Sequence, residues 1–220
     1  MSNSFKRLSI AIAAVALTGA AFAAPLTVTS YDMPNGDGQA HGGTYNYWDA
    51  TYSGSGNPTL DRSLLSGGTG KLTDGLVSTQ PWYVVSNVSG TGEYVGWYTS
   101  NPTITFHFAS SVTVSEVKLY VDNSHIGGVT APDSVIIDGT SYANPAWAVA
   151  SAPQLINITG LSLTGTSVTV QLTDPTYWVF MSEAQFDGST TPPVPEPETY
   201  ALMLAGLGAL GMVARRRRSV

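Results

Sequence analysis

Hydrophobic and polar residues alternate along several segments of this chain, and this pattern constrains the fold more than any other feature. In residues 103–108, 117–121 and 168–173 every second side chain is apolar. Successive side chains of a β-strand point to opposite faces, so each segment predicts a strand with one face in a core. Further strands are expected at residues 26–30, 45–52, 112–114, 134–137, 155–159 and 177–186, with turns at 138–139 and 164–166. No stretch of the body shows a helical period. The pattern therefore predicts an all-β fold, an antiparallel β-sandwich of the jelly-roll type.

The composition excludes several kinds of site and partner. None of the 220 residues is a cysteine, so disulfides, thiol catalysis and cysteine-ligated metals are absent. Of the nine basic residues only Arg62, Lys71 and Lys118 lie away from the two ends, against fifteen acidic residues in the chain. An acidic body repels phosphate backbones, so we expect no nucleic-acid partner. The same acidity is compatible with bound cations.

Residues 1–23 predict a secretory signal peptide. Lys6 and Arg7 form its positive region, an apolar stretch follows, and Ala21-Phe22-Ala23 is a small-residue cleavage site. The alternative is a retained membrane anchor or an N-terminal core helix. With a signal peptide, the β-sandwich domain at residues 24–190 is exported across the inner membrane.

The C-terminal end has three features in order. Residues 191–199 form a proline-rich linker, residues 200–214 are apolar, and four arginines follow. The motif Pro195, Glu196 and Pro197 and the cluster Arg215, Arg216, Arg217 and Arg218 resemble the PEP-CTERM sorting signal of Gram-negative bacteria that produce exopolysaccharide. The resemblance implies a transmembrane sorting helix with its arginine-rich tail at residues 200–220. It also implies one partner, an exosortase, which is a membrane enzyme that processes the chain near the Pro-Glu-Pro. A tail-anchored protein without processing is the alternative.

The body also resembles a known fold. Residues 72–75 (LTDG) followed by Thr79 and Trp82, the strand pair at 103–120, and residues 178–186 with their Ser-Glu pair are similar to the galactose-binding-like sandwich. Discoidin domains and many carbohydrate-binding modules share this fold. The resemblance implies a structural Ca²⁺ between the early loop and the last strand. Its ligands would be a backbone carbonyl near Lys71, the Asp74 carboxylate, Thr79, Glu183 and the Ala184 carbonyl.

The calcium prediction has a physical basis of its own. Asp74 and Glu183, brought together by the fold, repel each other unless a cation lies between them. The alternative is that Asp74 is a turn residue before Gly75 and that Glu183 is a solvated acid at a strand end.

Carbohydrate recognition is the second kind of binding that the residues allow. Sugar rings stack on aromatic side chains while polar groups bind their hydroxyls. Trp48, Trp97, Tyr98, Trp147 and Tyr177 are the aromatic residues in expected loops. The predicted ligand-binding residues are Trp48, Trp97, Asp122, Asn123, His125, Trp147 and Tyr177. Packing in the core is the alternative for each aromatic residue, as we expect for Trp82, Trp178 and Phe180.

No catalytic motif surrounds the histidines, which are His41, His107 and His125. We therefore assign no reaction. The sequence predicts an exported cell-surface or extracellular-matrix protein, associated with biofilm or exopolysaccharide, that acts as a non-catalytic carbohydrate-binding or adhesive module. Two alternatives stay open. One is a secreted glycan-active hydrolase using carboxylates such as Asp74 and Glu183, and the other is a structural matrix protein without a ligand.

Overall fold

The computed structural model describes residues 23–38, 45–86, 92–151, 153–174 and 176–190, and near the C-terminus residues 204–207, 210 and 215. The predicted signal peptide up to residue 22, His41, Pro195, Glu196, Pro197, Arg216, Arg217 and Arg218 lie outside the described residues. In the predicted sorting segment, residues 204–207 are helical and exposed, as are residues 210 and 215. None of the described helices has the length and apolar character needed to cross a membrane.

Strands make up most of the described residues. They are β1 (Ala24–Leu26), β2 (Val28–Pro34), β3 (Leu64–Gly68), β4 (Val95–Tyr98), β5 (Thr103–Val121), β6 (Ser134–Ile137), β7 (Thr140–Ala143), β8 (Gln154–Leu172) and β9 (Trp178–Thr190). The short helices of the body are η1 (Lys71–Thr73), α1 (Trp82–Val85) and η2 (Pro145–Ala148).

All ladders between the strands are antiparallel, and β5 lies at their centre. One edge of β5 pairs with β8 along most of its length. Its other edge pairs with β2 near Phe106 and with β9 from Val112 onwards. The sheet therefore runs in the order β1-β9-β5-β8-β6-β7, with β2, β3 and β4 attached at its sides.

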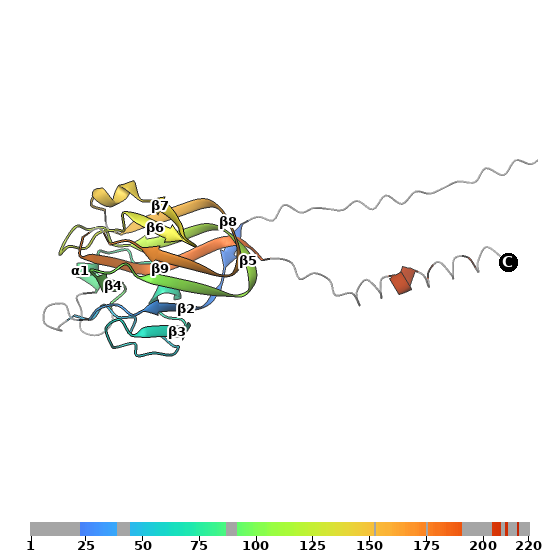
Figure 1. Ribbon diagram of the computed structural model, residues 1–220, viewed down its shortest axis with the longest axis horizontal. Helices are drawn as coiled ribbons and strands as arrows, with labels where there is room; N and C mark the ends of the chain where they lie inside the picture. The colour runs from blue at the N-terminus through green and yellow to red at the C-terminus, as the bar shows by residue number, and fades with distance from the viewer. Residues whose placement is uncertain are drawn as a thin grey trace, which may run out of the picture.

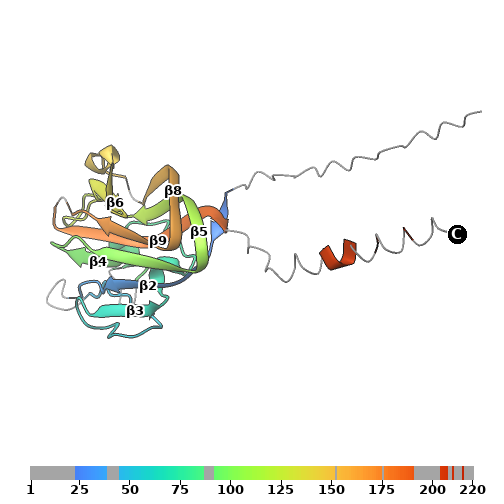
Figure 2. The ribbon, with the colours of Figure 1, turned by 45° about the vertical axis from the view of Figure 1, so that its right-hand side comes forward.

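The chain folds this sheet into two facing layers, which Figures 1 and 2 show as a sandwich. The register between β5 and β8 breaks between His107 and Val112, where both strands bend. Phe186 of β9 pairs with Val117 in the ladder, yet its ring lies 4.9 Å from that of Phe106. Phe106 belongs to the first half of β5, and Phe186 is paired with the second half. Their ring contact therefore means that the two halves of β5 face each other across a core. The predicted antiparallel β-sandwich is confirmed.

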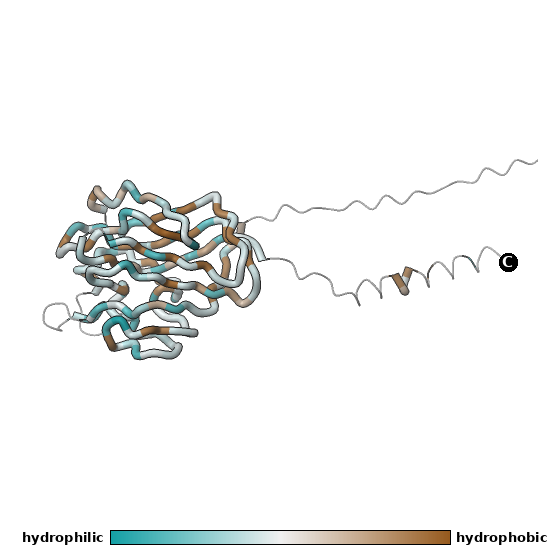
Figure 3. Tube along the Cα trace, viewed as in Figure 1, coloured by the Kyte–Doolittle hydropathy of each residue, from teal (hydrophilic) through white to brown (hydrophobic). Residues whose placement is uncertain are grey.

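The core follows from the alternation in the sequence. Every second residue of β5 is buried over most of its length, including Ile104, Phe106, Val117 and Leu119, each 0% exposed. Figure 3 shows the corresponding alternation of hydropathy along the strands. Each such side chain contributes about 1.5–3 kcal/mol by its removal from water.

Two sequence expectations are wrong. Residues 45–52 form a loop rather than a strand, because the Asp49 carboxylate in this segment is fully buried and accepts hydrogen bonds from the Tyr31 hydroxyl and the Lys71 N–H. Residues 164–166 lie inside β8 rather than in a turn, and Gly165 pairs with Val112. The turn at 138–139 is confirmed between β6 and β7.

The two ends of the sandwich differ. At one end, Trp178 at the start of β9 pairs with Tyr98, and the loop residues 99–102, 122–133, 173–174 and 176–177 gather there. At the other end, Thr190 pairs with Val112, and β1 pairs with β9 two residues before it. The body of the chain therefore begins and ends at the right-hand side of Figure 1, opposite its loops.

Candidate functional site

Two stacked tyrosines are exposed at the loop end of the sandwich. Tyr98 is 43% exposed and Tyr177 is 58% exposed. Their ring centroids are 6.4 Å apart and their planes differ by 19°. The half-buried ring of Trp178 lies 4.9 Å from Tyr98 and supports it. We call Tyr98 and Tyr177 the tyrosine pair, an apolar surface of the kind on which a flat ligand can stack.

An ion pair holds Tyr98 in place. The Tyr98 N–H donates to Asp37 Oδ2 at 2.7 Å, and Arg62 Nη2 donates to the Tyr98 carbonyl at 2.6 Å. Arg62 Nε in turn donates to Asp37 Oδ1 at 3.0 Å. These bonds fix the backbone on both sides of the ring, so Tyr98 is presented by a rigid support.

The loop 122–129 holds Tyr177. The Trp178 N–H and the Thr176 hydroxyl both donate to the Gly128 carbonyl, at 3.1 and 2.9 Å. Gly128 has φ +81°, and a Cβ at this position would lie 3.1 Å from the Tyr177 ring. Glycine therefore allows the loop to adopt this conformation directly against Tyr177.

Asp122 and Asn123 were expected to bind a ligand, but both are 0% exposed. The Asp122 carboxylate accepts the N–H groups of Trp82 and Ser124, at 2.7 and 2.8 Å. Asn123 donates to the carbonyls of Ala146 and Val149 and accepts the Ala131 N–H. The correction is that these two side chains build the loop instead of facing a ligand.

His125 and Trp147 are brought together by this same loop. The His125 side chain is exposed, and its Nε2 lies 2.7 Å from the Trp147 carbonyl oxygen. The Trp147 ring is half-buried and packs against the main core. Of the predicted ligand-binding residues, Tyr177 and His125 are the two with exposed side chains.

The remaining tryptophans serve the fold. Trp97 is 0% exposed, and its Nε1 donates to the Pro34 carbonyl at 2.9 Å, so it belongs to the core and not to a binding surface. Trp48 is half-buried, and its Nε1 donates to Asp61 Oδ1 at 2.6 Å. Trp97 and Tyr98 are neighbours on β4, and only one of two successive strand residues can face the core.

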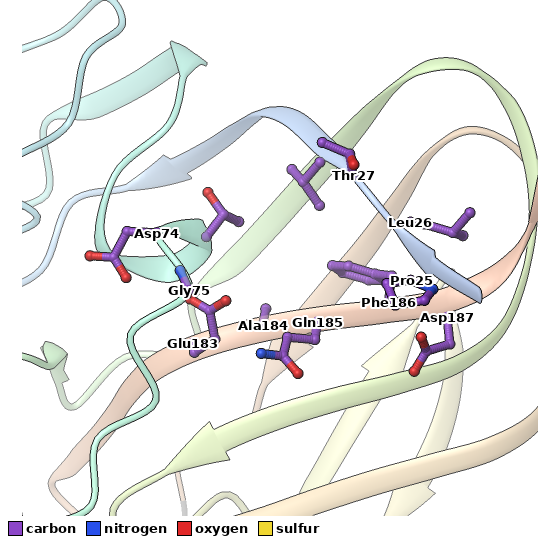
Figure 4. Close-up of a pocket in the computed structure, with 12 residues that line it drawn as sticks. Pro25, Leu26, Thr27, Asp74, Gly75, Glu183, Ala184, Gln185, Phe186 and Asp187 are labelled. Carbon is purple, nitrogen blue, oxygen red and sulfur yellow. Dashed lines mark hydrogen bonds between the residues drawn. The ribbon is translucent and has the colours of Figure 1, made fainter. Parts of the chain in front are cut away.

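A groove of about 430 Å³ lies over β9 and holds the two acids predicted to bind calcium (Figure 4). Asp74 follows η1, and Glu183 and Ala184 belong to β9. The Gly75 N–H points to Glu183 Oε2 at 3.4 Å. The fold thus brings Asp74, Glu183 and Ala184 to one groove, whereas Thr79 is exposed beyond it and the Lys71 side chain is directed to the Trp48 carbonyl.

The groove is electrostatically unbalanced. Glu183 is 3% exposed, and among the described residues no Lys, Arg or His forms an ion pair with it. Burial, and then the charge of Asp74, raise the pKa of Glu183 to about 7. The described residues contain no cluster of three or more His, Asp or Glu side chains that could hold a metal ion. A cation here would therefore depend on two carboxylates and on backbone carbonyls.

One histidine contacts a carboxylate elsewhere on the sandwich. His107 Nε2 lies 2.8 Å from Asp32 Oδ2 on the partly exposed face of β2 and β5. Burial raises the pKa of Asp32, but hydrogen bonds from His107, Ser66 and Gly67 outweigh it and hold this pKa below its ordinary value. Asp32 is therefore the common hydrogen-bond partner of Ser66 and His107.

Comparisons with known proteins agree with this architecture. Residues 27–188 match the family described as discoidin domain-containing receptor 1/2, DS-like domain, and residues 193–218 match the PEP-CTERM protein-sorting motif. No curated protein matches the sequence.

Several solved structures are similar to parts of this chain. Chitosan-binding module 1 of a chitosanase/glucanase from Paenibacillus sp. IK-5 is 19% identical, with 53% of this chain and 81% of that chain covered and a TM-score of 0.33. The module CpGH89CBM32-5 from Clostridium perfringens, in complex with GalNAc-β-1,3-galactose, is 13% identical, with 55% and 84% covered and a TM-score of 0.35. The CBM32 of AlyQ, in complex with 4,5-unsaturated mannuronic acid, is 15% identical, with 42% and 75% covered and a TM-score of 0.32.

The two sequence matches define a discoidin-like β-sandwich followed by a protein-sorting motif. The chain belongs to the discoidin domain-containing receptor 1/2, DS-like domain family. Both resemblances found in the sequence are thereby confirmed.

The role of Asp122 as a buried anchor gives a testable pH dependence. Burial raises the pKa of Asp122 above the model-compound value of 3.8, against hydrogen bonds from Ser124 and Trp82. The Asp122 carboxyl therefore has a higher pKa in the folded state than in the unfolded state. At pH values between these two pKa values the folded state binds the proton more tightly, so the free energy of unfolding falls as the pH rises. The free energy of unfolding of the native protein minus that of Asp122→Asn should therefore decrease from pH of about 4 towards neutrality. Urea unfolding at a series of pH values measures it, and a difference that grows with pH would contradict the assignment.

Proposed function

We propose that this chain is an exported, non-catalytic carbohydrate-binding module that binds sugar rings on the tyrosine pair. The observation that carries the proposal is the stacked, exposed pair Tyr98 and Tyr177, held by Asp37, Arg62 and the loop 122–129. Sugar rings expose C–H faces that pack against aromatic rings, and preorganised rings lose little entropy on binding.

Two observations support carbohydrates as the ligand class. The solved structures named above include a chitosan-binding module, a module in complex with GalNAc-β-1,3-galactose and a module in complex with 4,5-unsaturated mannuronic acid. In this chain, the exposed His125 and the partly exposed Arg62 provide hydrogen-bond donors in the part of the sandwich that holds the tyrosine pair. We infer a neutral or cationic polysaccharide, because the acidic body repels polyanions, and mannuronic acid oligomers should therefore bind least among these glycans.

The sorting motif supports a surface location. We infer that the signal peptide exports the chain and that an exosortase processes it at the membrane, near Pro195, Glu196 and Pro197. The processed protein then belongs to the cell surface or to a biofilm or exopolysaccharide matrix. Arg215 to Arg218 stay on the cytoplasmic side by the positive-inside rule, and the apolar segment before them crosses the membrane until it is processed.

We predict that Tyr98→Ala and Tyr177→Ala each weaken glycan binding by about tenfold or more, which corresponds to roughly 1.4 kcal/mol of lost stacking. Binding of the processed protein to chito-oligosaccharides, GalNAc-β-1,3-galactose and mannuronic acid oligomers on a glycan array measures this.

Tyr83→Ala is the matched control, because Tyr83 is 40% exposed on α1 and is not part of the tyrosine pair. It should leave binding unchanged. If Tyr98→Ala and Tyr177→Ala bind glycan as strongly as Tyr83→Ala and the native protein, each with an unchanged melting temperature, the tyrosine pair is excluded as the binding surface. Turnover of any of these glycans would instead favour the hydrolase.

Replacement of Arg215 to Arg218 by alanines should leave export intact and abolish C-terminal processing, because the positive-inside signal that positions the segment for cleavage is lost. Mass spectrometry of the cell-surface and membrane fractions measures the C-terminus. If the native chain stays full-length and in the cytosol, both the export and the sorting proposals fail.

We also propose a structural Ca²⁺ in the groove over β9. Asp74 and Glu183 would supply carboxylate oxygens, and the carbonyl of Ala184 would supply a third ligand. The backbone carbonyl near Lys71 remains part of the proposal, whereas Thr79 does not line the groove and is left out. The fit rests on the buried Glu183, which has no ion-pair partner among the described residues. Oxygen ligands of this kind are those that Ca²⁺ prefers.

A chelator should lower the melting temperature of the protein, and added Ca²⁺ should restore it, because a ligand that binds only the folded state stabilises that state. Glu183→Gln should remove this response. Glu116→Gln, which alters an ion pair with Lys118 on β5, should keep it. Melting curves of the native protein that are unaffected by chelator and by Ca²⁺ would remove the calcium proposal.

A further inference from the structure

One long stretch of the body contains no charged residue, although Lys118 and Glu116 of β5 pair with Asn157 and Thr159 of this stretch and Asp138 borders it. From residue 139 to residue 173 the sequence contains no Asp, Glu, Lys or Arg, although the body as a whole is acidic. This stretch includes β7, η2 and β8, which lie together at the top of Figure 1. It also exposes apolar side chains, with Val149 69% and Leu155 45% exposed. We call this surface the uncharged flank.

The uncharged flank contains an open strand edge. One edge of β8 pairs with β5, but its other edge pairs with β6 only at Val170, Gln171 and Leu172. Within the part of the chain that the structure describes, no strand pairs with that outer edge between Leu155 and Val168. Such an edge presents unpaired backbone N–H and C=O groups that can pair with another strand.

Soluble proteins protect open edges with charged residues, prolines or bulges. β8 has no charged residue and no proline. It has one bulge, near Gly160 with φ +74°, where the register with β5 shifts between Val114 and Glu116. The segment before the bulge, residues 154–159, is regular in register and unprotected. We call it the open segment.

We propose that the open segment pairs with the open segment of a second copy of this chain, antiparallel and around a two-fold axis at Asn157. An open strand edge is complementary to itself, and a two-fold pairing closes after two copies. The charge distribution favours this partner, because two acidic bodies repel each other except where they approach through the uncharged flank.

The exposure pattern sets the register. Leu155, Asn157 and Thr159 are exposed, whereas Ile156 and Ile158 are 7% and 8% exposed and face the core. Two residues that lie directly opposite each other in an antiparallel pair have side chains on the same face of the sheet. A two-fold axis must therefore place one residue opposite its own copy, because an axis between two successive residues would pair side chains of opposite faces. An axis at Asn157 pairs residues 155–159 of the two copies, which are five of the six residues of the open segment. It places Leu155 opposite Thr159 and extends the buried row of Ile156 and Ile158 from one copy to the next.

Because the native chain has no cysteine, engineered cysteines test this pairing directly in the full-length exported chain. Residues directly opposite each other in an antiparallel pair have Cα atoms about 4.5–5.5 Å apart, which a disulfide can bridge. Asn157→Cys should therefore form a dimer on a non-reducing gel. Leu155→Cys is the matched control, because the two copies of this residue would lie about 13 Å apart, beyond the reach of a disulfide. Leu155→Cys co-expressed with Thr159→Cys should form a mixed dimer.

A second measurement does not depend on disulfides. Asn157→Lys places two like charges opposite each other on the axis and should convert the dimer to a monomer in sedimentation equilibrium, with an unchanged melting temperature because the side chain is exposed. The proposal fails if Asn157→Cys gives no dimer, if Leu155→Cys alone cross-links equally well, or if the Asn157→Cys protein cross-links to a different protein. None of these readouts involves a glycan, so the proposal and the proposed function can fail separately.

Discussion

The structure depends on the pairing of β5 with strands on both of its edges. β5 pairs with β8 on one edge, and with β2 and then β9 on the other, and its bend between His107 and Val112 sends its two halves into opposite layers. Every buried aromatic contact between the layers, such as that of Phe106 with Phe186, follows from this bend. The loops at one end of the sandwich are then placed by the strands that they connect. The tyrosine pair is a product of the same ladder, since Tyr98 is held beside β9 by the pairing of β4 with Trp178.

Much of the fold could be predicted from the period of two in the sequence, because that period reports burial directly. The strand at 134–137 and the turn that follows it were predicted correctly, and the alternating segments 103–108, 117–121 and 168–173 all lie in strands. The period could not show that 103–108 and 112–121 form one continuous strand, because the residues between them break the alternation. Nor could it identify the loop at 45–52, where the buried Asp49 carboxylate outweighs the strand propensity of its aromatic neighbours.

The candidate site was less predictable than the fold, because the sequence does not show which polar loop residues are buried. Polar residues in a loop are equally compatible with a ligand and with the backbone of that loop, and only burial separates the two roles. Asp122 and Asn123 are completely buried and serve the backbone. Trp97 and Tyr98 were both loop candidates, but both lie on β4, whose first three residues are all buried, so only the burial seen in the structure assigns Trp97 to the core and Tyr98 to the surface. The contribution of Arg62 was missed because it depends on Asp37, which is distant in sequence.

β9 connects the end of the sandwich that carries the tyrosine pair with the C-terminal end of the body. The strand starts next to Tyr177, runs for 13 residues and ends at Thr190, the last residue of the body before the proline-rich stretch. At about 3.3 Å per residue it spans roughly 40 Å. A force applied at the C-terminal end of the body would therefore be transmitted along β9 to the end that carries the tyrosine pair, and the hydrogen bonds to β1, β4 and β5 would be loaded in shear. A domain pulled in this geometry resists extension by many hydrogen bonds at once.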